Sequence, residues 1–324
     1  MLPVRTVAVI LALSALAAPA RPRVGVLFWH DSPNDREAFE GVKDGFALAR
    51  LDPAYEVFEA KGDDAAARAA LRGFEARGLD LVYALGTGAA LRARDEVRRA
   101  PVVFTAVTDP VGSGVVGAAA GSGRNLCGTA SGVAPADVLR VFRAAVPGLR
   151  TLGAVLDPGN PVSRAEVAAL RAAGAAADPP LAVVAEERPA EDLARQGGVR
   201  EAAARLAASC DALWIPIDIA VYSRADEVAA GAATARRPVL ATAPAASRTA
   251  AAVCVSVDFR ALGRSSVEMA VRALRGEDPG AMAVRRPRSY RVIVNLEAAG
   301  RSGFEVPLAL LASADEFAGV AGGR

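Results

Sequence analysis

The chain has little of the chemistry that catalytic and metal sites require. Its 324 residues include one histidine, His30, and no group of histidine, cysteine or acidic residues has the spacing of metal ligands. The sequence GxSxG, the turn that carries the nucleophile of many serine hydrolases, does not occur. We therefore expect neither an enzyme nor a bound cofactor.

Cysteine is scarce as well. The three cysteines, Cys127, Cys210 and Cys254, lie far apart in apolar surroundings and form no CxxC pair. This spacing excludes a zinc ribbon and a disulfide framework. We expect all three to be small buried side chains.

An excess of charge of one sign is also missing. The chain has 38 basic and 36 acidic residues, which are interspersed, and its formal net charge is +2. Proteins that bind nucleic acid through the phosphate backbone need a basic face, and no such cluster is visible here. We therefore expect no nucleic-acid partner.

Only the beginning of the chain has the features of a targeting segment. Arg5 precedes an apolar run, 7–17, which ends in the small residues 18–20. Charge, apolar run and small residues in this order are typical of a secretory signal. No later run reaches the roughly 20 apolar residues of a membrane helix. We expect residues 1–20 to be removed near Ala20 on export, which leaves a soluble periplasmic protein.

In the rest of the chain, apolar strand-like runs alternate with amphipathic helix-like segments, in two series of about four strands each. This alternation predicts an α/β fold with two doubly wound parallel sheets of similar size, hence two lobes with a ligand cleft between them. The predicted strands are 24–29, 55–60, 79–85 and 101–107 in the first series and 151–157, 181–187, 211–218 and 238–243 in the second.

One further helix, 259–276, and one further strand follow after both series are complete. We expect the two lobes to share them, so that the chain passes between the lobes more than once. The predicted passages lie near residues 130, 255 and 289; the predicted parts are an N-terminal lobe of 21–130 plus about 258–288, a C-terminal lobe of 131–257 plus about 289–318, and a tail of 319–324.

A glycine motif follows the fourth strand, with Gly112, Gly114 and Gly117 in the spacing GxGxxG. A dinucleotide site would have this motif after the first strand and an acid at the end of the second. Asp137 has about the right separation, but it opens a helix. The position therefore favours a turn over a nucleotide site.

Polar residues follow the strand ends in both series. In open α/β sheets, ligands bind beyond the carboxyl ends of the strands, where helix amino termini offer free N–H groups. Hydroxyls and amides there can hold a carboxylate, and Asp109 or Asp218 can hold an ammonium, which together suit a small zwitterion. For each residue, a helix cap or a turn remains the alternative. The candidate residues are Thr87, Thr108, Asp109, Asn160, Ser163 and Asp218.

The order and spacing of several blocks resemble the periplasmic substrate-binding proteins of ABC transporters related to the tryptophan and tyrosine binding proteins, which have the type I periplasmic-binding fold. The resemblance runs from about Val24 to Phe317. The blocks include "LVYALGTGAAL", "PVVFTAVTDPVGSGVV", "AVLDPGNPVS", "DALWIPID" and "VDFRALGRSSVEMAVRALRGEDP".

The chain departs from the pattern of that family at two positions. Cys127 stands where a threonine is usual, and Val255 stands where a tyrosine is frequent, while Asp258 is retained. The missing tyrosine weakens the case for an aromatic ligand, because rings are recognised by stacking and apolar walls. Residues that can replace it are Trp29, Trp214 and Tyr222.

The resemblance implies a monomeric receptor without catalysis. Its two lobes close on a small, amino-acid-like ligand and present it to an ABC permease in the membrane, and the six candidate residues contact that ligand. Two alternatives remain. One is a sensory protein that reports ligand occupancy to a receptor kinase, and the other is an exported enzyme, for which Asp109 and Asp218 are the only candidate pair.

Overall fold

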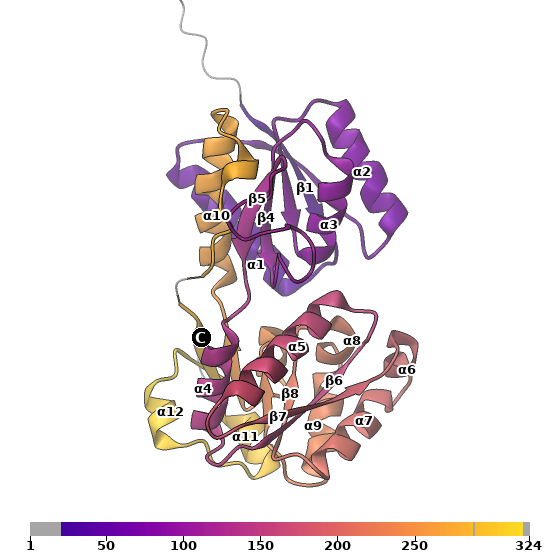
Figure 1. Ribbon diagram of the computed structural model, residues 1–324, viewed down its shortest axis with the longest axis vertical. Coiled ribbons are helices and arrows are strands. Elements are labelled where there is room, and N and C mark those ends of the chain that lie inside the picture. The colour runs from indigo at the N-terminus through magenta and orange to yellow at the C-terminus, as the bar shows by residue number, and fades with distance from the viewer. Residues whose placement is uncertain (1–20, 288, 320–324) are drawn as a thin grey trace, which may run out of the picture.

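The computed structural model describes residues 21–287 and 289–319, which form two α/β lobes, one above the other in Figure 1. The expected signal peptide, 1–20, lies outside the described residues, as does the expected tail except for Gly319. No helix in the described part of the chain is long and apolar enough to cross a membrane.

The first lobe contains a wholly parallel sheet of five strands in the order β2-β1-β3-β4-β5. Strands β3 and β4 are buried at every position, because helices cover both faces of the sheet. The elements of this part of the chain are β1 (Arg23–Phe28), α1 (Pro33–Leu48), β2 (Ala54–Glu59), α2 (Asp64–Ala76), β3 (Leu81–Leu85), α3 (Thr87–Glu96), β4 (Val102–Val107) and β5 (Leu126–Ala130).

The second lobe contains a sheet of seven strands in the order β12-β11-β10-β9-β8-β6-β7. Its strands are β6 (Thr151–Leu156), β7 (Ala182–Glu187), β8 (Ala212–Ile215), β9 (Val239–Ala241), β10 (Val253–Ser256), β11 (Arg291–Asn295) and β12 (Glu316–Ala318). Its helices are α4 (Pro135–Ala145), α5 (Pro161–Ala176), α6 (Ala190–Ala194), α7 (Gly198–Ala207), α8 (Ile219–Tyr222), α9 (Ala225–Ala233), η1 (Pro244–Arg248), α11 (Leu296–Ser302) and α12 (Leu308–Ala312).

The second sheet differs from expectation in two respects, since it is larger than the first and it is not wholly parallel. Strands β10 and β11 are antiparallel, and Ser256 at the end of β10 is paired with Arg291 at the start of β11. The chain leaves this lobe after β10 and returns to it at β11, so the two strands run in opposite directions from the same end of the sheet.

Between β10 and β11 the chain forms α10 (Phe259–Leu274) and η2 (Pro279–Ala281). Helix α10 packs along α1 in the first lobe (Figure 1). The two backbones touch, because a Cβ atom at Gly41 would lie 1.9 Å from the carbonyl oxygen of Arg260, and one at Gly263 would lie 1.8 Å from that of Ala38. A helix that follows the second lobe in sequence therefore completes the first.

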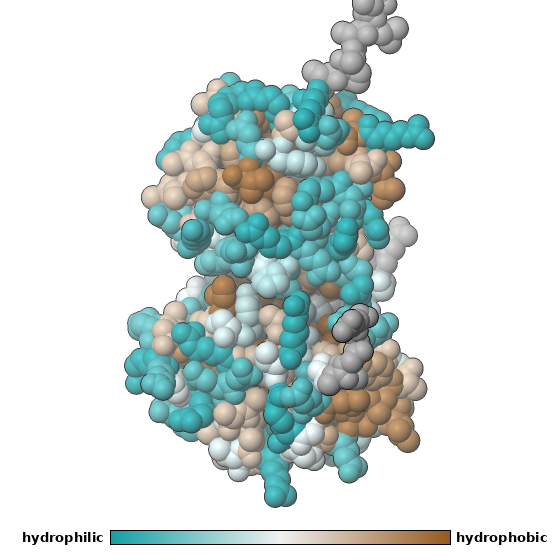
Figure 2. Space-filling view, turned by 180° about the vertical axis from the view of Figure 1, so that it is seen from behind, coloured by the Kyte–Doolittle hydropathy of each residue, from teal (hydrophilic) through white to brown (hydrophobic). Residues whose placement is uncertain are grey.

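Each lobe has a hydrophobic core on both faces of its sheet. Cys127, Cys210 and Cys254 are free and buried in these cores, which confirms the sequence prediction for them. Seen from behind, a waist separates the lobes (Figure 2). Three connecting segments pass between the lobes, after β5, after β10 and before β11.

Candidate functional site

Two adjoining spaces lie between the lobes. The interlobe cleft, of about 400 Å³, is lined by the β1–α1 loop and α3 of the first lobe and by the β6–α5 loop and α8 of the second. The hinge-side chamber, of about 220 Å³, is lined by the connecting segments, α5 and β8. The residues that line both spaces, and so make them continuous, are Thr108, Ser131, Ile217 and Phe259.

A fixed cation, Arg92, lines the cleft from the first lobe. Its guanidinium lies 3.9 Å from the centroid of the Trp29 ring, and its Nε donates a hydrogen bond of 2.8 Å to Asp64. The Trp29 ring also lies against Gly88 of the same helix, where a Cβ atom would come within 2.3 Å of the ring. Stacking and the ion pair together hold Arg92 in one orientation.

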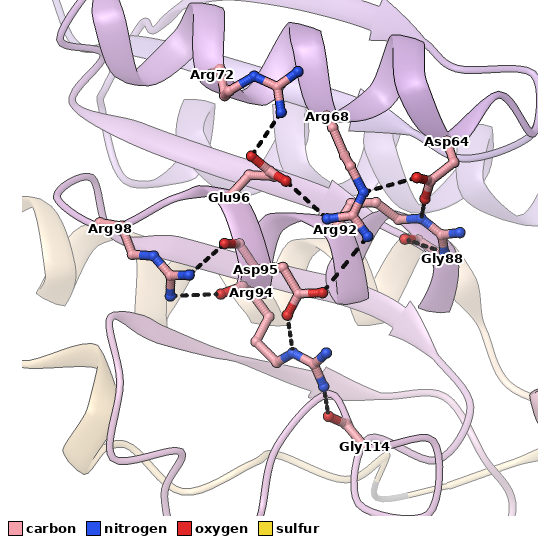
Figure 3. A network of polar contacts seen from close by, with 10 residues as sticks. All are labelled: Asp64, Arg68, Arg72, Gly88, Arg92, Arg94, Asp95, Glu96, Arg98 and Gly114. Atoms are coloured by element: carbon pink, nitrogen blue, oxygen red, sulfur yellow. Dashed lines mark hydrogen bonds and ion pairs between the residues drawn. The ribbon is translucent and has the colours of Figure 1, made fainter.

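Figure 3 shows the polar network that holds α2 against α3. Arg68 donates to Asp64 and to Glu96, at 2.8 Å in each case. Arg94, on the same helix as Arg92, donates to the carbonyl oxygen of Gly114 in the loop after β4. Exposed ion pairs of this kind add little stability one by one, but this network fixes the helix and the loop that line the site.

Thr87 and Asp35 lie on the same wall of the cleft. Thr87 is the first residue of α3, after Gly86, whose φ of +83° only glycine adopts readily. Asp35 lies in the first turn of α1, where burial raises its pKa to about 7 and a hydrogen bond from Ser32 opposes that rise. Thr87 follows the end of β3 closely, and Asp35 lies in the helix that follows β1.

Asp218 lines the cleft from the second lobe. Strand β8 ends at Ile215, three residues earlier than predicted, and Asp218 is the N-cap of α8. Its Oδ2 accepts hydrogen bonds from the Asp157 amide, at 2.9 Å, and from the Ser163 hydroxyl, at 2.7 Å, while its Oδ1 accepts one from the Ala220 amide at 3.1 Å. Burial raises the pKa of Asp218, and these hydrogen bonds oppose the rise.

The structure brings four of the six predicted residues, Thr87, Thr108, Asn160 and Asp218, to the cleft. The alternative role that the sequence left open is also present, because Asn160 accepts the Val162 amide at the start of α5 and Asp218 caps α8. Ser163 lies behind Asp218 and is fully buried, so it is not part of the cleft surface.

Asp109 lines the hinge-side chamber instead of the cleft. Its Oδ1 accepts hydrogen bonds from the amides of Val111 and Gly112, and a Cβ atom at Gly112 would lie 2.2 Å from its Oδ2. The first glycine of the GxGxxG motif therefore allows a tight turn around Asp109, which agrees with the prediction of a turn.

A carboxyl group that the sequence did not reveal lies in the wall of the chamber. Glu166 of α5 accepts the Ile217 amide at 2.7 Å. Burial raises its pKa to about 7, and the charge of Asp218 adds to the rise, while a hydrogen bond from Thr242 opposes it. The Thr242 hydroxyl in turn accepts a hydrogen bond of 3.0 Å from the indole N–H of Trp214.

Five acids line the two spaces, and within residues 21–287 and 289–319 none of them forms an ion pair. Carboxylates elsewhere on the molecule are commonly paired with arginine. Acids withdrawn from water without a counter-charge are costly, so this arrangement favours a ligand that supplies a cation or hydrogen-bond donors. The five are Asp35, Asp109, Asp157, Glu166 and Asp218.

Four residues of the site, Arg92, Asp35, Asp157 and Glu166, were not predicted. Asp157 directly follows β6. Asp35 follows the end of β1 in the first turn of a helix, so the rule that located the other candidates would have found it. Arg92 and Glu166 lie further along α3 and α5, and only the packing of those helices brings them to the site. No local pattern marks them.

Residues 23–318 match the family of ABC transporter substrate binding proteins. The tyrosine-binding protein of Clostridioides difficile is 24% identical over 216 residues, which are 67% of this chain and 61% of that relative, so less than two thirds of the relative's length is matched.

Solved structures share the fold. One is an ABC domain from Streptococcus pneumonia in complex with L-Trp, with a TM-score of 0.80 and 23% identity over 92% of this chain and 100% of that one. Another is a conserved domain protein from Vibrio cholerae, with a TM-score of 0.81 and 23% identity over 92% and 99%. The expected type I periplasmic-binding fold is thereby confirmed. The chain belongs to the ABC transporter substrate-binding protein family.

Proposed function

We propose that this protein is the extracytoplasmic, monomeric receptor of an ABC importer, and that it captures a small amino-acid-like ligand between its lobes and delivers it to the membrane permease. The observation that carries the proposal is the distribution of charge in the cleft. The first lobe contributes a fixed cation, Arg92, which is paired with Asp64, and the acid Asp35, whose pKa burial raises to about 7. The second lobe contributes two acids without ion-pair partners among the described residues, Asp157 and Asp218.

The first lobe binds the carboxylate of the ligand. Arg92 supplies the positive charge, and Thr87 supplies a hydroxyl at the amino end of α3, where the backbone N–H groups have no partner within the helix. Because Trp29 and Asp64 already orient Arg92, it loses little freedom when the ligand binds.

The second lobe binds the ammonium group. Asp157 accepts the Gly159 amide through Oδ1, and its Oδ2 makes no hydrogen bond to another described residue. Asp218 lies next to it and contributes the second negative charge. Ser163 and Asn160 act as positioning residues, because Ser163 holds Asp218 and Asn160 fixes the start of α5.

Closure of the lobes follows from the placement of the carboxylate-binding groups on one lobe and the ammonium-binding groups on the other. A zwitterion can satisfy Arg92 and the acids together only when both walls contact it, so its affinity for the closed form exceeds its affinity for the open form. We propose binding without catalysis, since no serine or cysteine is hydrogen-bonded to a histidine within the described residues. The names of the relatives, which mention tyrosine and L-Trp, make aromatic amino acids the first ligands to test.

The test is a thermal-shift screen of the purified protein against the standard L-amino acids. A ligand that binds only the folded protein stabilises it by about 2.7 kcal/mol at 100 times its dissociation constant. We expect at least one amino acid to raise the melting temperature of the native protein, and Arg92→Gln to abolish that rise. The matched control is Arg98→Gln, because Arg98 donates to the backbone of α3 and does not line the cleft.

If no amino acid shifts the melting temperature, the proposed function is wrong. If an amino acid raises the melting temperature equally in the Arg92→Gln and Arg98→Gln variants, the proposed function stands but Arg92 does not bind the ligand.

A further inference from the structure

The hinge-side chamber is a second, more apolar space behind the charged cleft. Side chains of Val138, Leu170, Trp214 and Val255 form much of its wall. Its volume of about 220 Å³ exceeds the roughly 150 Å³ of an engineered apolar cavity that holds benzene. The chamber therefore has room for one ring-sized group that enters from the cleft.

Glu166 lies in this apolar wall and, like Asp109, has no counter-charge among the described residues. Two donors of the protein, the Ile217 amide and the Thr242 hydroxyl, reach its carboxylate. An ionised carboxylate accepts about four hydrogen bonds, so acceptor capacity remains on the side that faces the chamber. The other charged residues that line the chamber are Asp109 and the exposed Arg286, and neither pairs with Glu166 among the described residues.

We propose that the hinge-side chamber receives the side chain of the ligand, and that Glu166 selects side chains that are ring-sized, carry no negative charge and end in an N–H or O–H donor. This inference rests on the proposed function, because the cleft must hold the ammonium and carboxylate for the side chain to point into the chamber. Thr108, Ser131, Ile217 and Phe259, which line both spaces, mark the way between them.

The requirement for a donor follows from the cost of leaving Glu166 unsatisfied. When the lobes close, the ligand side chain displaces the water that is hydrogen-bonded to the Glu166 carboxylate. A side chain without a donor leaves that hydrogen bond unreplaced, whereas an N–H or O–H group replaces it. A negatively charged side chain is disfavoured, because the acids Asp109 and Glu166 line the chamber and would repel it. Burial raises the pKa of Glu166 to about 7, so above that pH the carboxyl group is ionised and only accepts hydrogen bonds.

The first experiment compares ligands that differ only in the donor, by calorimetry on the native protein. The pairs are L-tyrosine with L-phenylalanine, and L-tryptophan with 1-methyl-L-tryptophan. We expect the donor-bearing member of at least one pair to bind roughly tenfold or more tightly, as for other hydrogen bonds to a charged group. Glu166→Gln keeps an acceptor for the Ile217 amide but presents an amide N–H to the chamber, so the preference should disappear.

The second experiment fills the chamber. Ala169 lines it from α5, and its neighbour Ala168 is exposed and lines neither space. Ala169→Leu should weaken the binding of ring-bearing amino acids roughly tenfold, while the matched control Ala168→Leu should leave it unchanged. Both positions are exposed on the helix, so neither change should prevent folding, and a thermal melt of each variant checks this.

The outcomes separate the two proposals. If amino acids bind but neither donor pair shows a preference, or if Ala169→Leu behaves like Ala168→Leu, the chamber is not the side-chain pocket and the proposed function stands. If no amino acid binds the native protein, the proposed function fails and this inference fails with it.

Discussion

Asp218 lies where a helix cap and a ligand contact are both possible, and the sequence left this choice open. The structure shows three hydrogen bonds from its own lobe to this carboxylate, which lines the cleft although it is almost inaccessible to solvent. Capping alone would account for the Ala220 bond. Capping does not explain why this buried acid has no ion pair within the described residues. A ligand ammonium would supply the missing cation.

Asp218→Asn separates the two roles, since it keeps the shape of the side chain and removes its charge. If Asp218 holds the ligand's ammonium, calorimetry should show a loss of roughly 2 to 5 kcal/mol in binding free energy. If it only caps α8, the free energy of unfolding should fall by roughly 1 kcal/mol and the affinity should stay the same. The control is Asp278→Asn, a cap of η2 that lines neither space.

At the scale of residues, the sequence predicts what lies directly after a strand and little else. Thr87, Thr108, Asn160 and Asp218 were found because the carboxyl ends of parallel strands meet at one edge of a sheet. Arg92 and Glu166 escaped because they lie within helices, at positions that carry charged residues in many solvent-exposed helices. Their roles depend on which face of the helix the tertiary structure turns toward the cleft.

Among the elements, α3 determines most of the first wall, because it carries Thr87 and Arg92 and supports Trp29. Alanine is ordinarily a better helix former than glycine by about 1 kcal/mol. At Gly88, however, a Cβ atom would come within 2.3 Å of the Trp29 ring, so the ring has to move. Its displacement removes the surface on which Arg92 lies.

We therefore expect Gly88→Ala to lower ligand affinity by roughly tenfold or more, the equivalent of about 1.4 kcal/mol. Calorimetry measures this loss, and Trp29 fluorescence should report the moved ring. The matched control is Gly73→Ala in α2, where the new Cβ would meet only the end of the Arg77 side chain, 3.0 Å away. Equal affinity of the Gly88 variant and the native protein would show that the Trp29 and Arg92 stack does not contribute to the site.

The helices and strands were largely predictable from the sequence. The wrong predictions concern the burial, length and direction of individual strands in the sheets. The run 55–60 was predicted as a largely buried strand, but β2 is an edge strand and only half-buried. The run 211–218 was predicted to be one strand, but β8 ends at Ile215, before Pro216. The antiparallel pair β10 and β11 has no local signal, because strand direction depends on where the chain re-enters the lobe.

At the scale of the whole molecule, the important feature is that the chain passes between the lobes three times. The passages follow β5, follow β10 and precede β11. All three border the chamber, which is lined by Ser131 after β5, by Ser256 at the end of β10 and by Arg286 before β11. A ligand side chain in the chamber would contact the segments that bend when the lobes move, which couples its fit directly to closure.

The same topology predicts that residues 21–130 do not fold on their own. Without α10, the part of the core that it covers on α1, β4 and β5 would be exposed to water. Full burial of a large apolar side chain contributes about 1.5–3 kcal/mol. The loss of the side chains that α10 buries is therefore comparable with the whole stability of a typical domain, about 5–15 kcal/mol. The side chains of α10 that are buried in this core are Phe259, Leu262, Val267, Met269 and Ala270.

We expect fragment 21–130 to give no cooperative thermal transition by circular dichroism. Joining 258–287 to it through a flexible linker should restore one, because α10 then covers α1 again. In the linked fragment, Gly263→Ala is the matched test of that packing, since its Cβ atom would lie 1.8 Å from the Ala38 carbonyl oxygen, and such overpacking typically costs about 1–3 kcal/mol. A cooperative melt of 21–130 alone would mean that the first lobe is independent of α10, and that the passages between the lobes serve hinge motion without contributing to its fold.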